Sequence, residues 1–179
     1  DYLETCGKAG VTLSPEKFRF CRREVEFVGF NVGWNSYAPS TGKLAAIAHF
    51  PMPDKPTITD IRSFAGLVNQ MAPFMATAPV MEPFRALLKD SQSKHVYWDE
   101  QLKKRFEEAK SAVCKLVSNG LQYYDKDKPT ALLTDWSRTG IGFVILQQHC
   151  QCSGLERPFC CKDGWKLALC GSRYLTSAE

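Results

Sequence analysis

One stretch, residues 131–148, constrains the fold of this chain more than any other. Two short apolar runs flank a polar segment of Asp, Ser, Arg, Thr and Gly residues, a pattern typical of two adjacent strands joined by a tight turn. Asp135 falls where the first run ends, so we expect its carboxylate to point away from the core on a rigid strand. Rigid carboxylates suit hard cations such as Mg²⁺. An Asp that begins a turn also commonly hydrogen-bonds the backbone, so the pattern alone leaves both roles open.

Length and composition indicate a globular chain. Its 179 residues are 44% hydrophobic, which is enough to bury the core of one domain or two small ones. A net charge of +4 is compatible with a polyanionic partner without establishing one. No apolar run approaches the length of a membrane span, so we expect no membrane partner. The first residues carry neither Met nor a signal-peptide pattern, and we expect an excised piece of a longer, cytoplasmic protein.

The N-terminal part predicts a helix ending before Gly10, followed by a hairpin. Alternating polar and apolar residues at 18–21 and 25–32 favour two strands that turn around residues 22–24. Residues 34–40 are loop-like, and residues 41–50 are expected to form a short helix.

Three prolines within residues 51–56 mark a linker, because proline removes amide donors and forbids a regular helix. Thr57 and Asp60 then form a capping-box pattern ahead of a helix. A longer helix is expected after Asp99, closed by Gly120. Its apolar face is predicted to be Leu102, Phe106, Ala109, Val113 and Leu116. Residues 165–173 alternate like a third strand of the C-terminal sheet.

Several of these motifs resemble the Pol polyprotein of gypsy-type LTR retrotransposons. Residues 10–17 followed by 25–30 are similar to the end of the reverse transcriptase palm, residues 62–69 to the thumb, and the helix after Trp98 to the connection. Residues 124–147, with Tyr124-Asp125, Lys128-Pro129 and the segment from Thr134 to Gln147, resemble the start of the ribonuclease H domain.

The resemblance implies roles for individual residues. The family's primer grip, which positions the growing DNA end, is matched by Phe27, Val28, Gly29 and Phe30. Arg62 is implied as a phosphate contact, although it is equally well explained as a solvated helix arginine; Lys104 and Arg105 are implied to touch the duplex backbone. Asp135 matches the catalytic carboxylate that opens the family's four-carboxylate set for two metal ions.

The implied architecture is α+β. It comprises a palm-end β-hairpin over residues 1–52, a small helical thumb over 53–94, and a connecting helix with a partial RNase H-like domain of three antiparallel strands over 95–179. The implied parent is an RNA-directed DNA polymerase with Mg²⁺-dependent endonuclease activity on the RNA strand of RNA/DNA hybrids, located in the cytoplasm, a virus-like particle or the nucleus. Its partners would be the hybrid, the template-primer duplex and the rest of the Pol polyprotein.

This chain lacks the paired polymerase aspartates and at least three of the four nuclease carboxylates, so whether it is itself an enzyme stays open. We expect it to contribute template-primer handling and one metal ligand. The alternative is a non-catalytic, retroelement-derived module that binds nucleic acid or protein.

The late cysteines, Cys150, Cys152, Cys160 and Cys161, have a spacing that is not a standard zinc-finger pattern. Reduced thiols in a loop are favoured over a structural zinc, and a disulfide is less favoured still in a reducing compartment. A zinc-stabilised binding domain centred on these cysteines remains a third reading of the chain's function.

Overall fold

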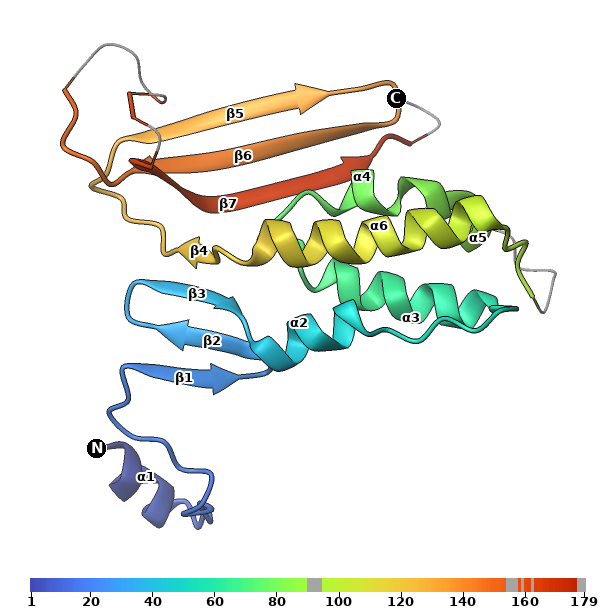
Figure 1. Ribbon diagram of the computed structural model, residues 1–179. Coiled ribbons are helices and arrows are strands. Elements are labelled where there is room, and N and C mark those ends of the chain that lie inside the picture. The colour runs from blue at the N-terminus through green and yellow to red at the C-terminus, as the bar shows by residue number, and fades with distance from the viewer. Residues whose placement is uncertain (90–94, 154–157, 159, 162, 177–179) are drawn as a thin grey trace.

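The structure is a computed structural model, and it describes residues 1–89, 95–153, 158, 160–161 and 163–176. These residues form an α+β protein with two antiparallel sheets packed on a group of helices, which confirms the predicted fold class (Figure 1). The strands are β1 Glu24–Phe27, β2 Phe30–Gly33, β3 Ser36–Pro39, β4 Leu121–Gln122, β5 Thr130–Trp136, β6 Gly140–Gln148 and β7 Trp165–Tyr174. The helices are α1 Tyr2–Lys8, α2 Thr41–Ala48, α3 Ile58–Asn69, α4 Thr77–Met81, the 3-10 turn η1 Glu82–Phe84, α5 Arg85–Lys89 and α6 Glu100–Val117.

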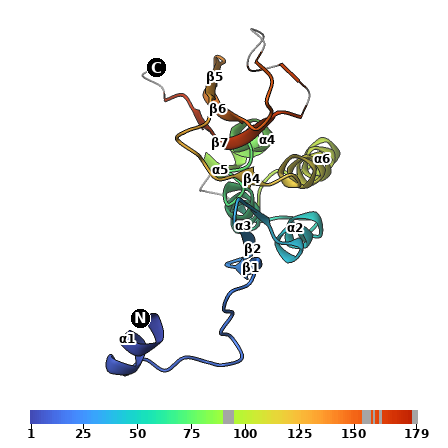
Figure 2. The same cartoon turned by 90° about the vertical axis from the view of Figure 1, so that its left-hand side faces the viewer.

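Helix α1 stands apart from the rest of the molecule (Figures 1 and 2). Asp1 caps it by accepting a hydrogen bond from the Leu3 amide, and Gly10 follows it with a positive φ of 68°. No residue of α1 is buried, so its stability comes from its own caps and side-chain pairs and not from packing.

The first sheet has the order β1-β2-β3-β4, and two sequence-based expectations about it were wrong. The hairpin turns at Val28 and Gly29, and not around residues 22–24. Both turn residues have a positive φ, which suits a two-residue hairpin turn. The extended run expected at residues 18–21 is interrupted by Cys21, whose φ is 50°. The segment predicted as a loop contains β3. Tertiary packing holds this strand, since the Tyr37 ring stacks on Tyr123 and meets the edge of Phe74.

The capping box predicted from the sequence is present at the start of α3. Thr57 and Asp60 form a complete capping box, and Ile61, Ala65 and Val68 are buried. On α6 the expected inner face needs one correction: Leu116 is 57% exposed, whereas Val117 is fully buried. Val117 follows Val113 by four residues and so shares its helix face with the other buried residues, Phe106 and Ala109, whereas Leu116 lies beside that face.

One hydrophobic core joins the helices to the first sheet. Phe64 of α3, Phe84 of η1 and Phe106 of α6 are almost fully buried, and their rings pack edge to face. Trp98 lies against the rings of Phe84 and Phe106. The core therefore contains residues from both sides of the predicted boundary between 94 and 95; the domain limits themselves stay a prediction.

The second sheet has three antiparallel strands, as predicted, and their order is β5-β6-β7. Its β7 strand packs on α4, because the Tyr174 hydroxyl donates to the Ala78 carbonyl over 2.6 Å and the Ala78 amide donates to the Ser172 hydroxyl. Figure 1 shows this sheet covering the helices on one side. Within the described part of the chain, no helix is both long enough and apolar enough to cross a membrane.

Candidate functional site

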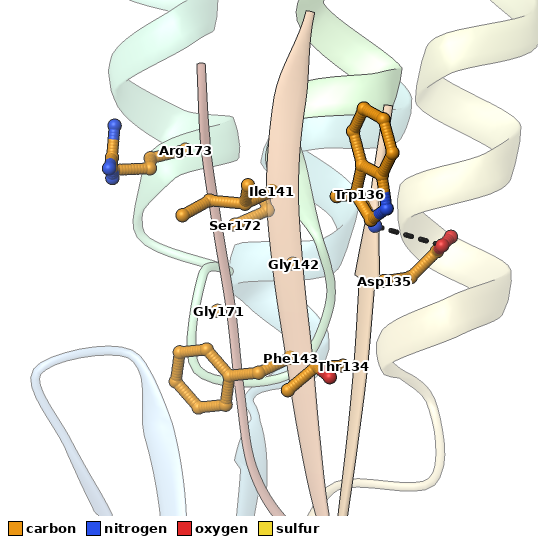
Figure 3. A pocket seen from close by; sticks show the side chains of 9 residues that line it. All are labelled: Thr134, Asp135, Trp136, Ile141, Gly142, Phe143, Gly171, Ser172 and Arg173. Atoms are coloured by element: carbon orange, nitrogen blue, oxygen red, sulfur yellow. Dashed lines mark hydrogen bonds between the residues drawn. The ribbon is translucent and has the colours of Figure 1, made fainter. Parts of the chain in front are cut away.

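Asp135 lies near the end of β5, paired with Gly142 of β6. Its side chain is exposed, and its Oδ1 accepts a hydrogen bond of 2.8 Å from the Trp136 amide. Since side chains alternate along a strand, Asp135 and the Phe143 ring belong to opposite faces of the sheet; in Figure 3 they point in different directions. The local sequence folds this way because Ser137 closes the β5–β6 turn with a hydrogen bond from its amide to the Gly140 carbonyl.

A shallow groove of about 580 Å³ runs over this end of the sheet (Figure 3). It is lined by Thr134, Asp135, Trp136, Ile141, Gly142, Phe143, Gly171, Ser172 and Arg173. Trp136, 76% exposed, and Arg173 provide an aromatic surface and a cation on strands that flank β6. The groove therefore offers apolar and cationic contacts on the face of the sheet that carries the Phe143 ring. Residue Asp135 is among those that line the groove, but its carboxylate belongs to the opposite face.

An exposed carboxylate on a regular strand fits Mg²⁺ as a single oxygen ligand. Among the described residues, however, no cluster of three or more potential metal ligands includes Asp135. A two-metal site needs several carboxylates to clamp both ions. The residues present therefore fit one ligand position and do not complete a nuclease centre.

The segment of Phe27, Val28, Gly29 and Phe30 forms the tip of the β1–β2 hairpin. Phe27 and Phe30 close a two-residue turn, and Phe27 and Val28 are 68% and 71% exposed. Lys43 of α2, which the sequence did not single out, donates from Nζ to the Val28 carbonyl over 3.2 Å. Its ammonium also lies 3.9 Å from the centre of the Phe30 ring. The turn therefore presents two exposed apolar side chains beside a cation.

The other predicted nucleic-acid contacts lie on different elements. Arg62 is exposed on α3, and Lys104 and Arg105 are exposed on α6. Arg105 pairs with Glu108 of the same helix at 3.5 Å, an exposed ion pair of little stabilising effect. The structure brings none of the three into the groove beside Asp135.

A second, polar groove of about 510 Å³ was not foreseen from the sequence. It is lined by Trp34, Asn35, Gln122, Tyr123, Tyr124, Asp125, Lys126, Asp127, Lys128 and His149. Burial, reinforced by Lys128 and Lys166, lowers the pKa of His149, so this imidazole is mostly neutral at pH 7. In the sequence, the tyrosines and lysines of residues 123–128 were the available signal for this groove. Only the fold places them beside Trp34.

The four late cysteines come together at the end of β6 and the beginning of β7. The sulfur atoms of Cys150, Cys152, Cys160 and Cys161 all lie within 4.8 Å of one another. Hydrogen bonds from the Cys152 backbone amide and the Gln148 side chain lower the pKa of Cys150 to about 6. Hydrogen bonds with Cys150 and Cys161 raise the pKa of Cys152 to about 12. The cluster thus concentrates negative charge on Cys150.

Comparison with known proteins gives this fold a context. The chain is 33% identical over 152 residues to the retrovirus-related Pol polyprotein from transposon gypsy of Drosophila melanogaster, and 30% identical over 166 residues to that of transposon opus from the same organism. Its relatives are retrotransposon Pol polyproteins. A Tf2 polyprotein of Schizosaccharomyces pombe is 25% identical over 151 residues.

These alignments cover 78%, 87% and 83% of the chain, but only 14%, 16% and 11% of the respective polyproteins. The chain therefore spans a small part of the relatives it matches, and the similarity to Pol extends over most of its own length. No protein-family profile matches the chain.

Solved structures agree on the fold. A foamy viral protease-reverse transcriptase in complex with double-stranded DNA matches 99% of the chain, with a TM-score of 0.75, 20% identity and 28% of its own length covered. The foamy viral enzyme in complex with an RNA/DNA hybrid matches 92% of the chain with a TM-score of 0.69, 19% identity and 20% coverage. The chain thus shares the fold of part of the foamy viral protease-reverse transcriptase.

Proposed function

We propose that this chain holds the template-primer duplex and the RNA/DNA hybrid as part of a retrotransposon reverse transcriptase and ribonuclease H. The observation that carries the proposal is the exposed Phe27–Phe30 turn beside Lys43, in a chain that is similar to Pol over most of its length. The rest of the Pol polyprotein is the proposed partner, and the cytoplasm, a virus-like particle or the nucleus its place of action.

The hairpin turn has the chemistry that a primer grip requires. Gly29 leaves room for the Lys43 side chain, since a Cβ there would lie 2.7 Å from Lys43 Cε. Lys43 in turn holds the Val28 carbonyl, so the tip is tethered to α2. A tethered tip with exposed Phe27 and Val28 can pack against sugars, while the ammonium attracts phosphate.

Arg62, Lys104 and Arg105 are proposed as further phosphate contacts, because all three are exposed on helices. Such contacts position a duplex without reading its sequence. We therefore expect the affinity for a duplex to depend on its charge and shape and to fall as the salt concentration rises.

Asp135 is proposed as one Mg²⁺ ligand of the nuclease centre, on the strength of its exposure at the end of β5. When bound, the ion would supply charge stabilisation at the scissile phosphate. Among the described residues, no group of three or more potential metal ligands includes Asp135, so we derive no cleavage step for this chain. The same observation favours the alternative, a non-catalytic module that binds nucleic acid or protein.

The test combines binding of a labelled RNA/DNA hybrid across a salt series with Mg²⁺-dependent cleavage of the same hybrid. We expect binding that weakens with salt and no cleavage. Lys43→Ala should weaken binding several-fold, whereas Lys8→Ala, on the separate helix α1, should not change it. Absence of salt-dependent binding would refute the proposal. Cleavage abolished by Asp135→Asn would show that other groups complete the metal site.

A further inference from the structure

Four thiols converge at one end of the second sheet. Cys150 and Cys152 follow β6, and Cys160 and Cys161 precede β7. Because β6 and β7 are antiparallel and Gln148 pairs with Trp165, both ends of their connection meet at the same sheet end. All four sulfur atoms lie within 4.8 Å of one another, and the Cys150 and Cys160 sulfurs are 3.6 Å apart.

We propose that Cys150, Cys152, Cys160 and Cys161 form a structural zinc site that closes the β6–β7 connection. Tetrahedral zinc with bonds of about 2.3 Å sets its sulfur ligands about 3.8 Å apart. The Cys150–Cys160 distance already matches this spacing, and the other pairs need to contract by about 1 Å or less. Four cysteines fill every coordination position, which is typical of structural and not catalytic zinc.

The surroundings of the thiols support a thiolate site. The Trp165 indole donates from Nε1 to the Cys160 sulfur over 3.1 Å, and the Gln148 amide donates to the Cys150 sulfur over 3.3 Å. The same Gln148 amide donates to the Cys152 carbonyl over 2.8 Å, which orders the turn between two ligands. Donors of this kind orient metal ligands and offset the charge on sulfur.

Gly164 makes the close approach of the thiols possible. A Cβ at this position would lie 2.5 Å from the Cys150 sulfur and would also overlap the Cys161 sulfur. The backbone of Gly164 is held in place as well, because its carbonyl accepts a 2.7 Å hydrogen bond from the His149 amide. Glycine is therefore required at this position because the Cys150 and Cys161 side chains approach its backbone closely.

His149 is the obvious competing ligand, and its side chain faces elsewhere. Its Nδ1 lies 3.2 Å from Lys128 Nζ, on the side of the polar groove. The ligand set is therefore four cysteines and not three cysteines with a histidine. The cluster also lies at the far end of β6 from Asp135, which pairs near the beginning of that strand. The zinc site is thus distinct from the proposed Mg²⁺ ligand, and its test does not depend on nucleic-acid binding.

The chain, purified under reducing conditions without chelator, should contain about one zinc ion per molecule by elemental analysis. Replacement of zinc by cobalt(II) should produce the visible d–d bands and thiolate charge-transfer band of a tetrahedral tetrathiolate site. Folded chain with less than about 0.2 equivalents of zinc would overturn the proposal, as would a six-coordinate cobalt spectrum or cysteine pairs oxidised to disulfides in place of the metal.

Matched variants separate the cluster from other thiols. Cys150→Ser and Cys160→Ser should each lose the tetrathiolate cobalt spectrum, whereas Cys21→Ser, an exposed thiol near the first sheet, and His149→Ala should keep it. Gly164→Ala should lower zinc affinity roughly 10-fold or more with all thiols intact. Gly66→Ala is its control, because nothing lies within 4 Å of a Cβ there. A full tetrathiolate spectrum in Cys150→Ser or Cys160→Ser would refute the assignment.

Discussion

At the scale of single residues, Val28 holds a conformation that β-branched side chains rarely adopt. Its φ is +52°, next to a φ of +77° at Gly29, so the tip is a two-residue turn in which Asn-Gly would be the favoured pair. Strain that persists at an exposed tip indicates a role for the side chain, in agreement with the proposed primer grip.

Val28→Asn should therefore stabilise the fold by about 1 kcal/mol, since Asn tolerates the left-handed region better than Val. The same variant should bind the RNA/DNA hybrid more weakly because an exposed apolar contact is lost. Urea unfolding and hybrid titration measure the two effects. Val11→Asn is the control and should do neither, because Val11 is also exposed but its own φ is not positive.

Gln147 is a buried amide that ties the segment before β5 to the second sheet. Its Oε1 accepts from the Asp125 amide over 2.8 Å, and its Nε2 donates to the Asp125 carbonyl and the Thr130 hydroxyl. Gln147→Ala leaves these groups without their partner and should lower the free energy of unfolding by about 1–3 kcal/mol. Urea unfolding should show no comparable loss for Gln101→Ala, which is exposed on α6. Equal losses would contradict the role assigned to Gln147.

At the scale of elements, the start of α3 contributes to the free energy of unfolding by an amount that depends on pH. Hydrogen bonds from the Thr57 backbone amide and hydroxyl lower the pKa of Asp60 below its ordinary value of 3.8. A carboxyl with a lowered folded-state pKa stabilises the fold above its unfolded pKa, and that stabilisation is lost as pH falls through the folded value.

Asp60→Asn should thus destabilise the protein at pH 6, and the difference from the natural chain should shrink as pH falls below 3.8. Thr57→Ala should cost about 1 kcal/mol through the lost cap. Chemical unfolding at a series of pH values measures both. Asp54→Asn, in the exposed linker, is the control, and a pH dependence equal to that of Asp60→Asn would argue against the cap.

At the scale of the whole molecule, the ring cluster of Phe64, Phe84 and Phe106 connects α3 and η1 to α6. Phe106 is only 3% exposed and touches rings from both other elements. We therefore expect α3 and α6 to unfold as one unit, although the predicted domain boundary lies between them.

Phe106→Ala should destabilise the protein by about 3–5 kcal/mol, because it leaves a cavity among the three rings. Hydrogen exchange should show amides of α3 and α6 losing protection together. Leu116→Ala, on the exposed side of α6, should change neither. Loss of protection confined to α6 would mean that the two helices fold independently.

Local signals predicted those parts of the fold whose determinants lie close together in sequence. The capping box at Thr57, the linker prolines and the paired strands around residues 131–148 all rest on interactions within a few residues. Asp135 was placed correctly at the end of a strand for the same reason. The strand β3 was missed, since Tyr37 is held by rings from distant segments.

The sequence by itself determined the α+β class, most helix starts and the three antiparallel C-terminal strands, because periodicity and caps are short-range. Only the tertiary structure decided that Lys43 reaches the hairpin tip, that Val117 replaces Leu116 in the core and that four cysteines of irregular spacing share one place. Those outcomes depend on which segments, distant in sequence, the fold brings into contact. Antiparallel pairing of β6 with β7 brings Cys150 and Cys160 together however the residues between them are spaced.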